Sequence, residues 1–135
     1  MSEFQGRWKL VSSERFDDYM KVIGVGRLAR LAARNSPVTL NISVDVDRVV
    51  VRSSSVFKDY TLQFVIGKEF EEVTIDGRRL LTTFFFEQGH LIQQQAAIEE
   101  KDVNSRITRW IHEGLLYTEL QAGDVKALRI FKRLH

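Results

Sequence analysis

From residue 38 to the end of the chain, short runs with apolar residues at every second position alternate with turn signals. The runs VTLNISVD (38–45) and YTLQFVI (60–66) are two of these. A period of two is typical of strands with one buried face. Turn signals, among them the dipeptides Asp76-Gly77, Gln88-Gly89 and Glu113-Gly114, recur at intervals of about 8 to 12 residues. The pattern predicts a mainly β fold, an antiparallel up-and-down β-barrel of about ten strands (a β-clam).

The N-terminal part of the sequence departs from this pattern. The segment FQGRWKLVS (4–12) predicts a first strand that includes Phe4 and Trp8. Between about residues 15 and 35, apolar residues recur at helical spacings, which predicts a short helix–turn–helix. The two apolar stripes are Phe16, Tyr19, Met20 and Ile23 in the first helix, and Leu28, Leu31 and Ala32 in the second. Two such short helices cannot enclose a core alone, so we expect both stripes to pack against the barrel as a cap.

The composition narrows the class of protein. Twenty basic and eighteen acidic residues are interleaved and leave a net charge of +2, which does not favour a nucleic-acid partner. The absence of cysteine excludes disulfides and thiolate metal sites. The N-terminus lacks the features of a secretory signal, and no apolar run has the length of a membrane span. We expect one domain over residues 1–135, in a cytoplasmic, monomeric protein without cofactor or metal.

Polar residues interrupt the strand runs at positions where a dry core would be aliphatic. A barrel of about ten strands is wide enough to enclose a cavity, in which water and polar side chains lie together. On the last strand, Arg129 shares a face with Ala127 and Phe131. The other polar positions of this kind are Ser53, Ser55, Thr82, Gln93, Gln95, Arg109 and Thr118.

Three stretches of the sequence resemble the intracellular fatty-acid-binding proteins, a family of intracellular lipid-binding proteins in the calycin superfamily. They are FQGRWKLVSSERFDDYMKVIGVGRLAR (4–30), SVFKDYTLQFVIGKEFEEVTIDGR (55–78) and the arginine-bearing strand VKALRIFKRL (125–134). The GxW motif of Gly6 and Trp8 alone is weak, because secreted lipocalins share it. Two helices directly after the first strand distinguish the intracellular family.

The resemblance implies a water-containing cavity that carries a long-chain fatty acid or a similar amphiphile. The family binds the ligand carboxylate with two arginines and a tyrosine, which correspond to Arg109, Arg129 and, as a departure, Phe131. Other cavity-lining positions correspond to Phe16, Met20, Gln95, Ile107, Thr118 and Leu120. The entrance in the family lies between the second helix and two strand turns, here Val25, Ala29, Ala33, Phe57, Lys58, Ile75, Asp76 and Arg78.

The helical segment is rich in cations, and these have two interpretations. They form either a solvated helix face or a surface for transient contact with anionic membranes, an attraction of about 1 kcal/mol per basic residue. The residues are Lys21, Arg27, Arg30 and Arg34.

Other functions remain as alternatives. A retinoid, a bile salt or a lysolipid could replace the fatty acid, and a structural membrane-associating protein could use the same barrel. An oligonucleotide-binding barrel would use Phe84 to Phe86 and Trp110 to stack bases. We expect no enzyme and no catalytic residue, because the three histidines are scattered and no catalytic motif is present.

Overall fold

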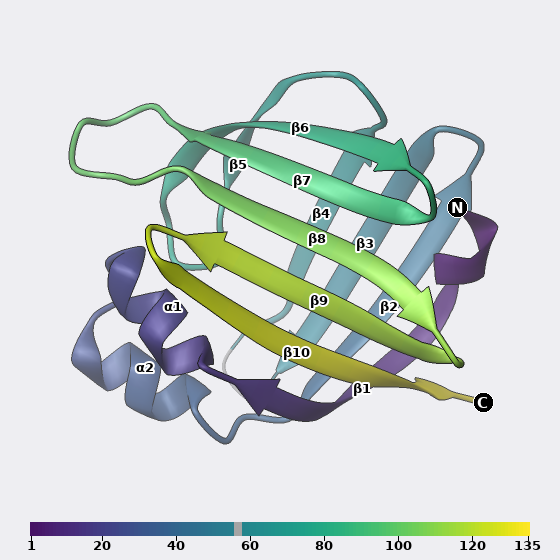
Figure 1. Cartoon of the computed structure of the whole chain (residues 1–135), viewed down its shortest axis with the longest axis horizontal. Coiled ribbons are helices and arrows are strands. Elements are labelled where there is room, and N and C mark those ends of the chain that lie inside the picture. The colour runs from purple at the N-terminus through teal and green to yellow at the C-terminus, as the bar shows by residue number, and fades with distance from the viewer. Residues whose placement is uncertain (56–57) are drawn as a thin grey trace.

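The computed structural model describes residues 1–55 and 58–135, and within these residues ten strands form one antiparallel sheet. The sheet curls into a nearly closed barrel (Figure 1), which confirms the predicted fold class. The strands are β1 Gly6–Glu14, β2 Val38–Asp45, β3 Arg48–Ser55, β4 Tyr60–Val65, β5 Phe70–Val73, β6 Arg79–Glu87, β7 His90–Ala97, β8 Ser105–His112, β9 Leu115–Ala122 and β10 Val125–Leu134.

Each strand pairs with the next along the chain, with one exception. The strand order is β4-β3-β2-β1-β10-β9-β8-β7-β6-β5, so the pairing of β1 with β10 joins the two ends of the chain. Strands β4 and β5 lie at the two ends of this order and, in the described part of the chain, do not pair with each other. A side-chain hydrogen bond connects them instead, because the Tyr60 hydroxyl on β4 donates to the backbone oxygen of Val73 on β5.

The first helix packs on the barrel as the sequence predicts. Helix α1 spans Phe16–Val22, and Tyr19, Met20 and Ile23 are buried. It lies against β9 and β10, and Figure 1 shows both helices at the end of the barrel where β9 turns into β10. Gly24 ends the helical stretch with a φ of 94°, which suits a residue without a side chain. No helix in the described residues is long and apolar enough to cross a membrane.

The expected packing of the second helix is wrong. Helix α2, Arg27–Ala33, has no buried residue, and Leu28 and Leu31 are 83% and 60% exposed. Ion pairs hold α2 to α1 instead, since Asp17 of α1 lies 3.4 Å from Arg30 and 3.5 Å from Arg34. Apolar periodicity shows that a helix has an apolar stripe but not which surface, if any, covers it.

The first strand also begins later than predicted. Phe4 belongs to a short 3-10 helix, η1 (Ser2–Phe4), and its buried backbone oxygen accepts a 2.9 Å hydrogen bond from Trp8 Nε1. The guanidinium of Arg133 stacks 4.1 Å from the centre of the Trp8 ring and donates to the backbone oxygen of Gln5. A Cβ on Gly6 would lie 2.5 Å from Arg133 Nη1, and the φ of Gly6 is 134°. The glycine of the GxW motif therefore makes room for Arg133.

The interior contains two separate apolar clusters. One surrounds Trp8 and includes Phe84 and Phe131, and the other lies under α1 and includes Tyr19 and Leu120. Several buried side chains belong to neither cluster because they are polar, as the interrupted strand patterns predicted. The buried polar residues are Glu72, Thr74, Thr82, Gln93, Gln95, Ser105 and Thr118.

Candidate functional site

Two arginines and a threonine form one row across three neighbouring strands. Arg109 on β8 lies opposite Thr118 on β9, and Thr118 lies opposite Arg129 on β10. Alternation along the strands sets their direction, since Thr118 and its neighbours Leu116 and Leu120 on the same face are buried. At about 4.8 Å between strands, the two arginine backbones stand roughly 10 Å apart. A small anionic group fits between two long side chains at that separation.

Arg129 reaches the interior beneath the first helix. Its guanidinium carbon lies 3.9 Å from the centre of the Phe16 ring, so α1 covers it with an aromatic face. Its Nε is buried and, in the described part of the chain, has no hydrogen-bond partner. Burial lowers the pKa of the Arg129 guanidinium to about 10, which leaves it charged at neutral pH. Arg129 is therefore a desolvated cation whose Nε can donate a further hydrogen bond.

Arg109 lies in a different environment because it has a polar partner. Its Nη1 donates a 2.9 Å hydrogen bond to Oε1 of Gln93 on the adjacent strand β7. Burial lowers the pKa of the Arg109 guanidinium to about 10, and the negative charge of Glu72 acts in the opposite direction. The two arginines therefore share a row but not an electrostatic environment.

Glu72 is a buried carboxylate that the sequence analysis missed. It is 5% exposed, and its Oε1 accepts hydrogen bonds from Thr82 Oγ1 at 2.7 Å, Gln93 Nε2 at 3.0 Å and Gln95 Nε2 at 3.0 Å. The available signal was alternation within FEEV (70–73), because half-buried Phe70 shares a face with Glu72. A pair of adjacent glutamates hides that signal, since one of them, Glu71, is exposed.

The predicted cavity positions are buried or half-buried, and several of them pack against α1. Met20, Gln95, Ile107, Thr118 and Leu120 are all below a tenth exposed. Ile107 pairs with Leu120 across β8 and β9, and half-buried Phe16 packs on the same apolar cluster. Beside α1 a hollow of about 240 Å³ opens to the surface, lined in part by Phe16 and Met20.

The described entrance positions lie in the helical segment, on the turn between β5 and β6 and, for exposed Lys58, between β3 and β4. Val25 and Ala33 are half-buried, Ala29 is exposed and Ile75 is 47% exposed. Phe57 lies outside the described residues.

The β5–β6 turn carries an ion pair, Arg78 Nε to Asp76 Oδ2 at 2.7 Å. Burial raises the pKa of the Asp76 carboxyl, but hydrogen bonds from Arg78 and Thr74 outweigh it and the net shift is downward. The charges of Arg78 and Asp76 also influence the pKa of Tyr19, which burial raises, so this turn lies near α1.

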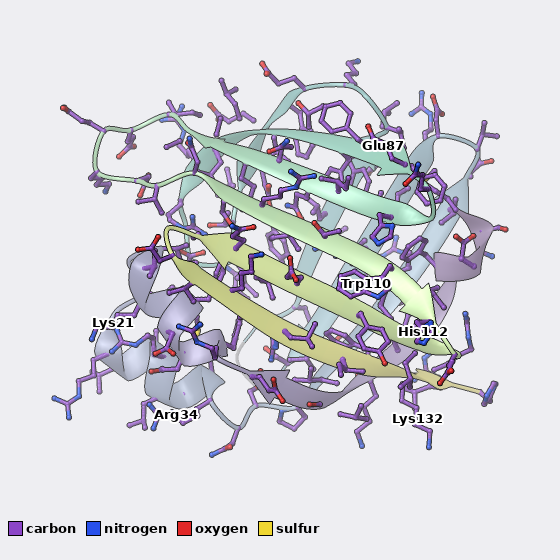
Figure 2. All side chains as sticks on the ribbon, in the orientation of Figure 1. Lys21, Arg34, Glu87, Trp110, His112 and Lys132 are labelled. Carbon is purple, nitrogen blue, oxygen red and sulfur yellow. The ribbon has the colours of Figure 1, made fainter. Side chains whose placement is uncertain are left out.

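The four helical cations differ in their surroundings. Arg30 is bound, since it pairs with Asp17 and donates a 2.8 Å hydrogen bond to the backbone oxygen of Val25. Arg34 pairs with Asp17 but remains 55% exposed. Lys21 and Arg27 are exposed and have no ion pair among residues 1–55 and 58–135. Figure 2 shows Lys21 and Arg34 at the helical end of the molecule, far from Lys132.

The phenylalanine run considered for base stacking does not form an exposed platform. Phe84 is 1% exposed and stacks on Phe64 inside the barrel, and Phe86 packs against the same apolar cluster. Phe85 points outward and is 39% exposed. Trp110 stacks on Tyr117, its cross-strand neighbour, with a ring separation of 5.5 Å. The alternation of strand faces thus separates the aromatic residues that a nucleic-acid interface would need together.

Comparison with known proteins agrees with this architecture. A family model described as "Lipocalin / cytosolic fatty-acid binding protein family" matches residues 5–133. Fatty acid-binding protein homolog 6 of Caenorhabditis elegans is 44% identical over 131 residues, which cover 97% of each chain.

Two solved structures have the same fold over almost the whole chain. The apo crystal structure of Caenorhabditis elegans lipid binding protein 8 has a TM-score of 0.96 at 41% identity and covers 99% of this chain and 97% of its own. A Schistosoma mansoni fatty acid binding protein in complex with arachidonic acid has a TM-score of 0.91 at 32% identity and covers 100% of this chain and 98% of its own. The chain belongs to the lipocalin / cytosolic fatty-acid-binding protein family.

Proposed function

We propose that this protein is a cytoplasmic, monomeric carrier that binds a long-chain fatty acid inside its barrel, with the carboxylate between Arg109 and Arg129. The observation that carries the proposal is the inward row of two charged arginines on either side of Thr118. Thr118 Oγ1, Gln95 Oε1 and Arg129 Nε are buried without a partner in the described part of the protein. Buried polar atoms without partners are costly, so a ligand head group and water would stabilise them.

The accessibility of the arginines supports a hollow interior. Burial dominates the pKa of both guanidinium groups, yet both residues are half-buried and not fully buried. A side chain that is surrounded by protein but keeps accessible surface borders an internal space. The exposed surface of Arg109 and Arg129 therefore supports a cavity at the place where the head group would lie.

Magnitudes assign different roles to the tail and the head group. Burial of a methylene contributes about 0.8 kcal/mol, so a sixteen-carbon chain offers roughly 12 kcal/mol before the cost of immobilisation. A carboxylate and a guanidinium both lose water when they meet, so their net contribution is small. The tail supplies most of the affinity, while Arg109 and Arg129 orient the ligand and select an anionic head.

The first experiment compares an acid with its neutral ester. We expect the wild type to bind palmitate more tightly than methyl palmitate, and Arg129→Gln to reduce this preference about tenfold, since a hydrogen bond to a charged group contributes about 1.5 kcal/mol. Competition with a fluorescent fatty acid measures both constants. Equal affinity of the wild type for acid and ester would contradict the carboxylate site.

A second measurement identifies the ligand class directly. Native mass spectrometry of the purified protein should detect a co-purified fatty acid. A retinoid, a bile salt or a lysolipid in its place would reject the proposed ligand and leave the barrel as a carrier of that other lipid.

We also propose that the helical end delivers the ligand to anionic membranes. Leu28 and Leu31 on α2 are exposed, and so are the cations Arg27 on α2 and Lys21 on α1. An apolar stripe flanked by cations suits the interface of an anionic bilayer, which attracts each basic residue by about 1 kcal/mol. The solvent-facing stripe of α2 supports this proposal, because no described protein surface covers it.

The test uses charge reversals that preserve the link between the helices. Lys21→Glu with Arg27→Glu should slow transfer of a fluorescent fatty acid to vesicles that contain phosphatidylserine by about tenfold or more, and should leave transfer to neutral vesicles unchanged. Lys9→Glu with Lys132→Glu is the matched control, because both residues are exposed and lie opposite each other on the adjacent strands β1 and β10. Equal rates for the two double variants would reject the membrane surface.

A further inference from the structure

One chain of hydrogen bonds connects Arg109 to the buried carboxylate of Glu72. A guanidinium can only donate, so its bond to Gln93 Oε1 fixes which side of that amide faces Arg109. Gln93 Nε2 must then face Glu72, and it donates to Oε1 at 3.0 Å and to Oε2 at 3.2 Å. Glu72 consequently accepts on both of its oxygens.

The two arginines of the site differ in the charges that surround them. Glu72 is the buried carboxylate whose charge acts on Arg109, through a network that also includes Gln95 and Thr82. For Arg129, burial alone lowers the pKa of the guanidinium, and its Nε has no hydrogen-bond partner among the described residues. The arginine row and the network of Glu72 thus contain two guanidinium groups and one carboxylate, a net charge of one positive unit, to which the ion pair of Arg78 with Asp76 adds nothing. A single negative charge on the ligand neutralises it.

We infer that Glu72 determines the charge of the accepted head group, because it neutralises Arg109 through Gln93 and leaves Arg129 to select a monoanionic lipid. The inference rests on the proposed function of carrying a fatty acid. Glu72 acts through Gln93 and Arg109, so it is a positioning residue and does not contact the ligand. A dianionic head group is disfavoured in the wild type, since its second negative charge would be desolvated without a cation to neutralise it.

The charge balance can be tested with two lipids of equal tail length. Palmitate is a monoanion at pH 8, and hexadecyl phosphate is a dianion there, because the second pKa of a phosphate monoester is about 6. Glu72→Gln keeps the size of the side chain and raises the charge of the site to two positive units. We expect this variant to improve the affinity for hexadecyl phosphate relative to palmitate by about tenfold or more, whereas damage to the barrel would weaken both ligands alike.

The chain contains a matched control one residue away. Glu71 is exposed on the opposite face of β5 and pairs with Arg79 at 2.7 Å. Glu71→Gln removes the same charge from the outside of the barrel, so the ratio of the two affinities should stay that of the wild type. A change of equal size in Glu71→Gln and Glu72→Gln would overturn the inference, because a general change in net charge would then explain both.

A rescue experiment keeps the inference testable if Glu72→Gln alone folds poorly. Arg109→Gln leaves Glu72 and Arg129 as the charges of the site, and palmitate binding should fall by about tenfold or more. The double variant Arg109→Gln with Glu72→Gln removes both members of the neutral pair, so it should bind palmitate about threefold or more tighter than Arg109→Gln alone, although it still lacks the contact of Arg109 with the carboxylate. Failure of this rescue would overturn the assignment of Glu72 to Arg109.

The outcomes separate the inference from the function on which it rests. If the wild type does not distinguish palmitate from methyl palmitate, the carboxylate site itself is refuted. If the wild type prefers the acid but Glu72→Gln leaves the ratio of phosphate to carboxylate affinity unchanged, the carrier function stands and the role of Glu72 is refuted.

Discussion

Phe131 occupies the position where the intracellular fatty-acid-binding proteins have a tyrosine. It is 4% exposed and lies on the same strand face as Arg129. A phenyl ring cannot donate a hydrogen bond to the carboxylate. We expect Phe131→Tyr to increase the preference for palmitate over methyl palmitate by about fivefold, because an added hydrogen bond contributes about 1 kcal/mol. Competition binding with both ligands measures the ratio. An unchanged ratio would show that the head group lies beyond reach of this position.

At the level of single residues, the sequence predicted which side chains are buried better than it predicted their hydrogen-bond partners. The resemblance to the fatty-acid-binding proteins predicted interior positions for Gln95 and Thr118, and both side chains are buried. The sequence could not predict that Gln93 connects Arg109 to Glu72, because those three residues lie on three different strands and meet only through the register of the sheet. Contacts of this kind depend on strand pairing, which a period of two does not encode.

At the level of elements, the strands were predictable and the second helix only in part. Strands β2 and β4 repeat their apolar residues at the period of a one-sided strand, and the barrel confirms both strands. The apolar residues of α2 are just as periodic, yet Leu28 and Leu31 face outward. An apolar stripe is buried within the protein only if another part of the same chain covers it. In our proposal, a membrane covers the stripe of α2 instead.

The attachment of α2 gives a prediction at this scale. Because α2 buries no residue, the ion pairs of Asp17 with Arg30 and Arg34 are its main links to α1. We expect Asp17→Asn to weaken this link by about 1 kcal/mol and to accelerate amide hydrogen exchange in α2 about fivefold. Hydrogen exchange with mass spectrometry resolves a peptide over residues 27–33.

Asp18→Asn is the control for this measurement. Asp18 pairs with Arg15, 3.4 Å away, and makes no ion pair with α2. Exchange in α2 should therefore match the wild type. If Asp17→Asn also matched the wild type, the ion pairs would not hold the helix.

At the scale of the whole molecule, the sequence predicted a barrel but not where the barrel is open. Turn signals and alternation contain no information about the missing ladder between β4 and β5, because both strands have ordinary patterns and ordinary partners. The hydrogen bond from Tyr60 to Val73 connects the two strands across this gap. A titratable side chain therefore contributes to the closure of the barrel.

This contribution should appear in the stability of the protein at alkaline pH. Burial raises the pKa of Tyr60 to about 12, and the negative charges of Glu72 and Asp76 add to the effect. An unfolded tyrosine loses its proton near pH 10. Between about pH 10 and pH 12 the unfolded state thus binds fewer protons than the folded state, so the free energy of unfolding falls as the pH rises.

The variant Tyr60→Phe isolates this contribution. Arg109 and Arg129, whose pKa values burial lowers to about 10, release protons from the folded state in the same range and act in the opposite direction. Only the difference between wild type and variant therefore reports Tyr60. We expect the wild type to lose about 1 kcal/mol more than Tyr60→Phe between pH 10 and 12, a value reduced by solvent screening at this half-buried side chain. Urea unfolding at several pH values measures it, with Tyr117→Phe on β9 as the control; parallel curves for wild type and Tyr60→Phe would show that the gap between β4 and β5 does not depend on this hydroxyl.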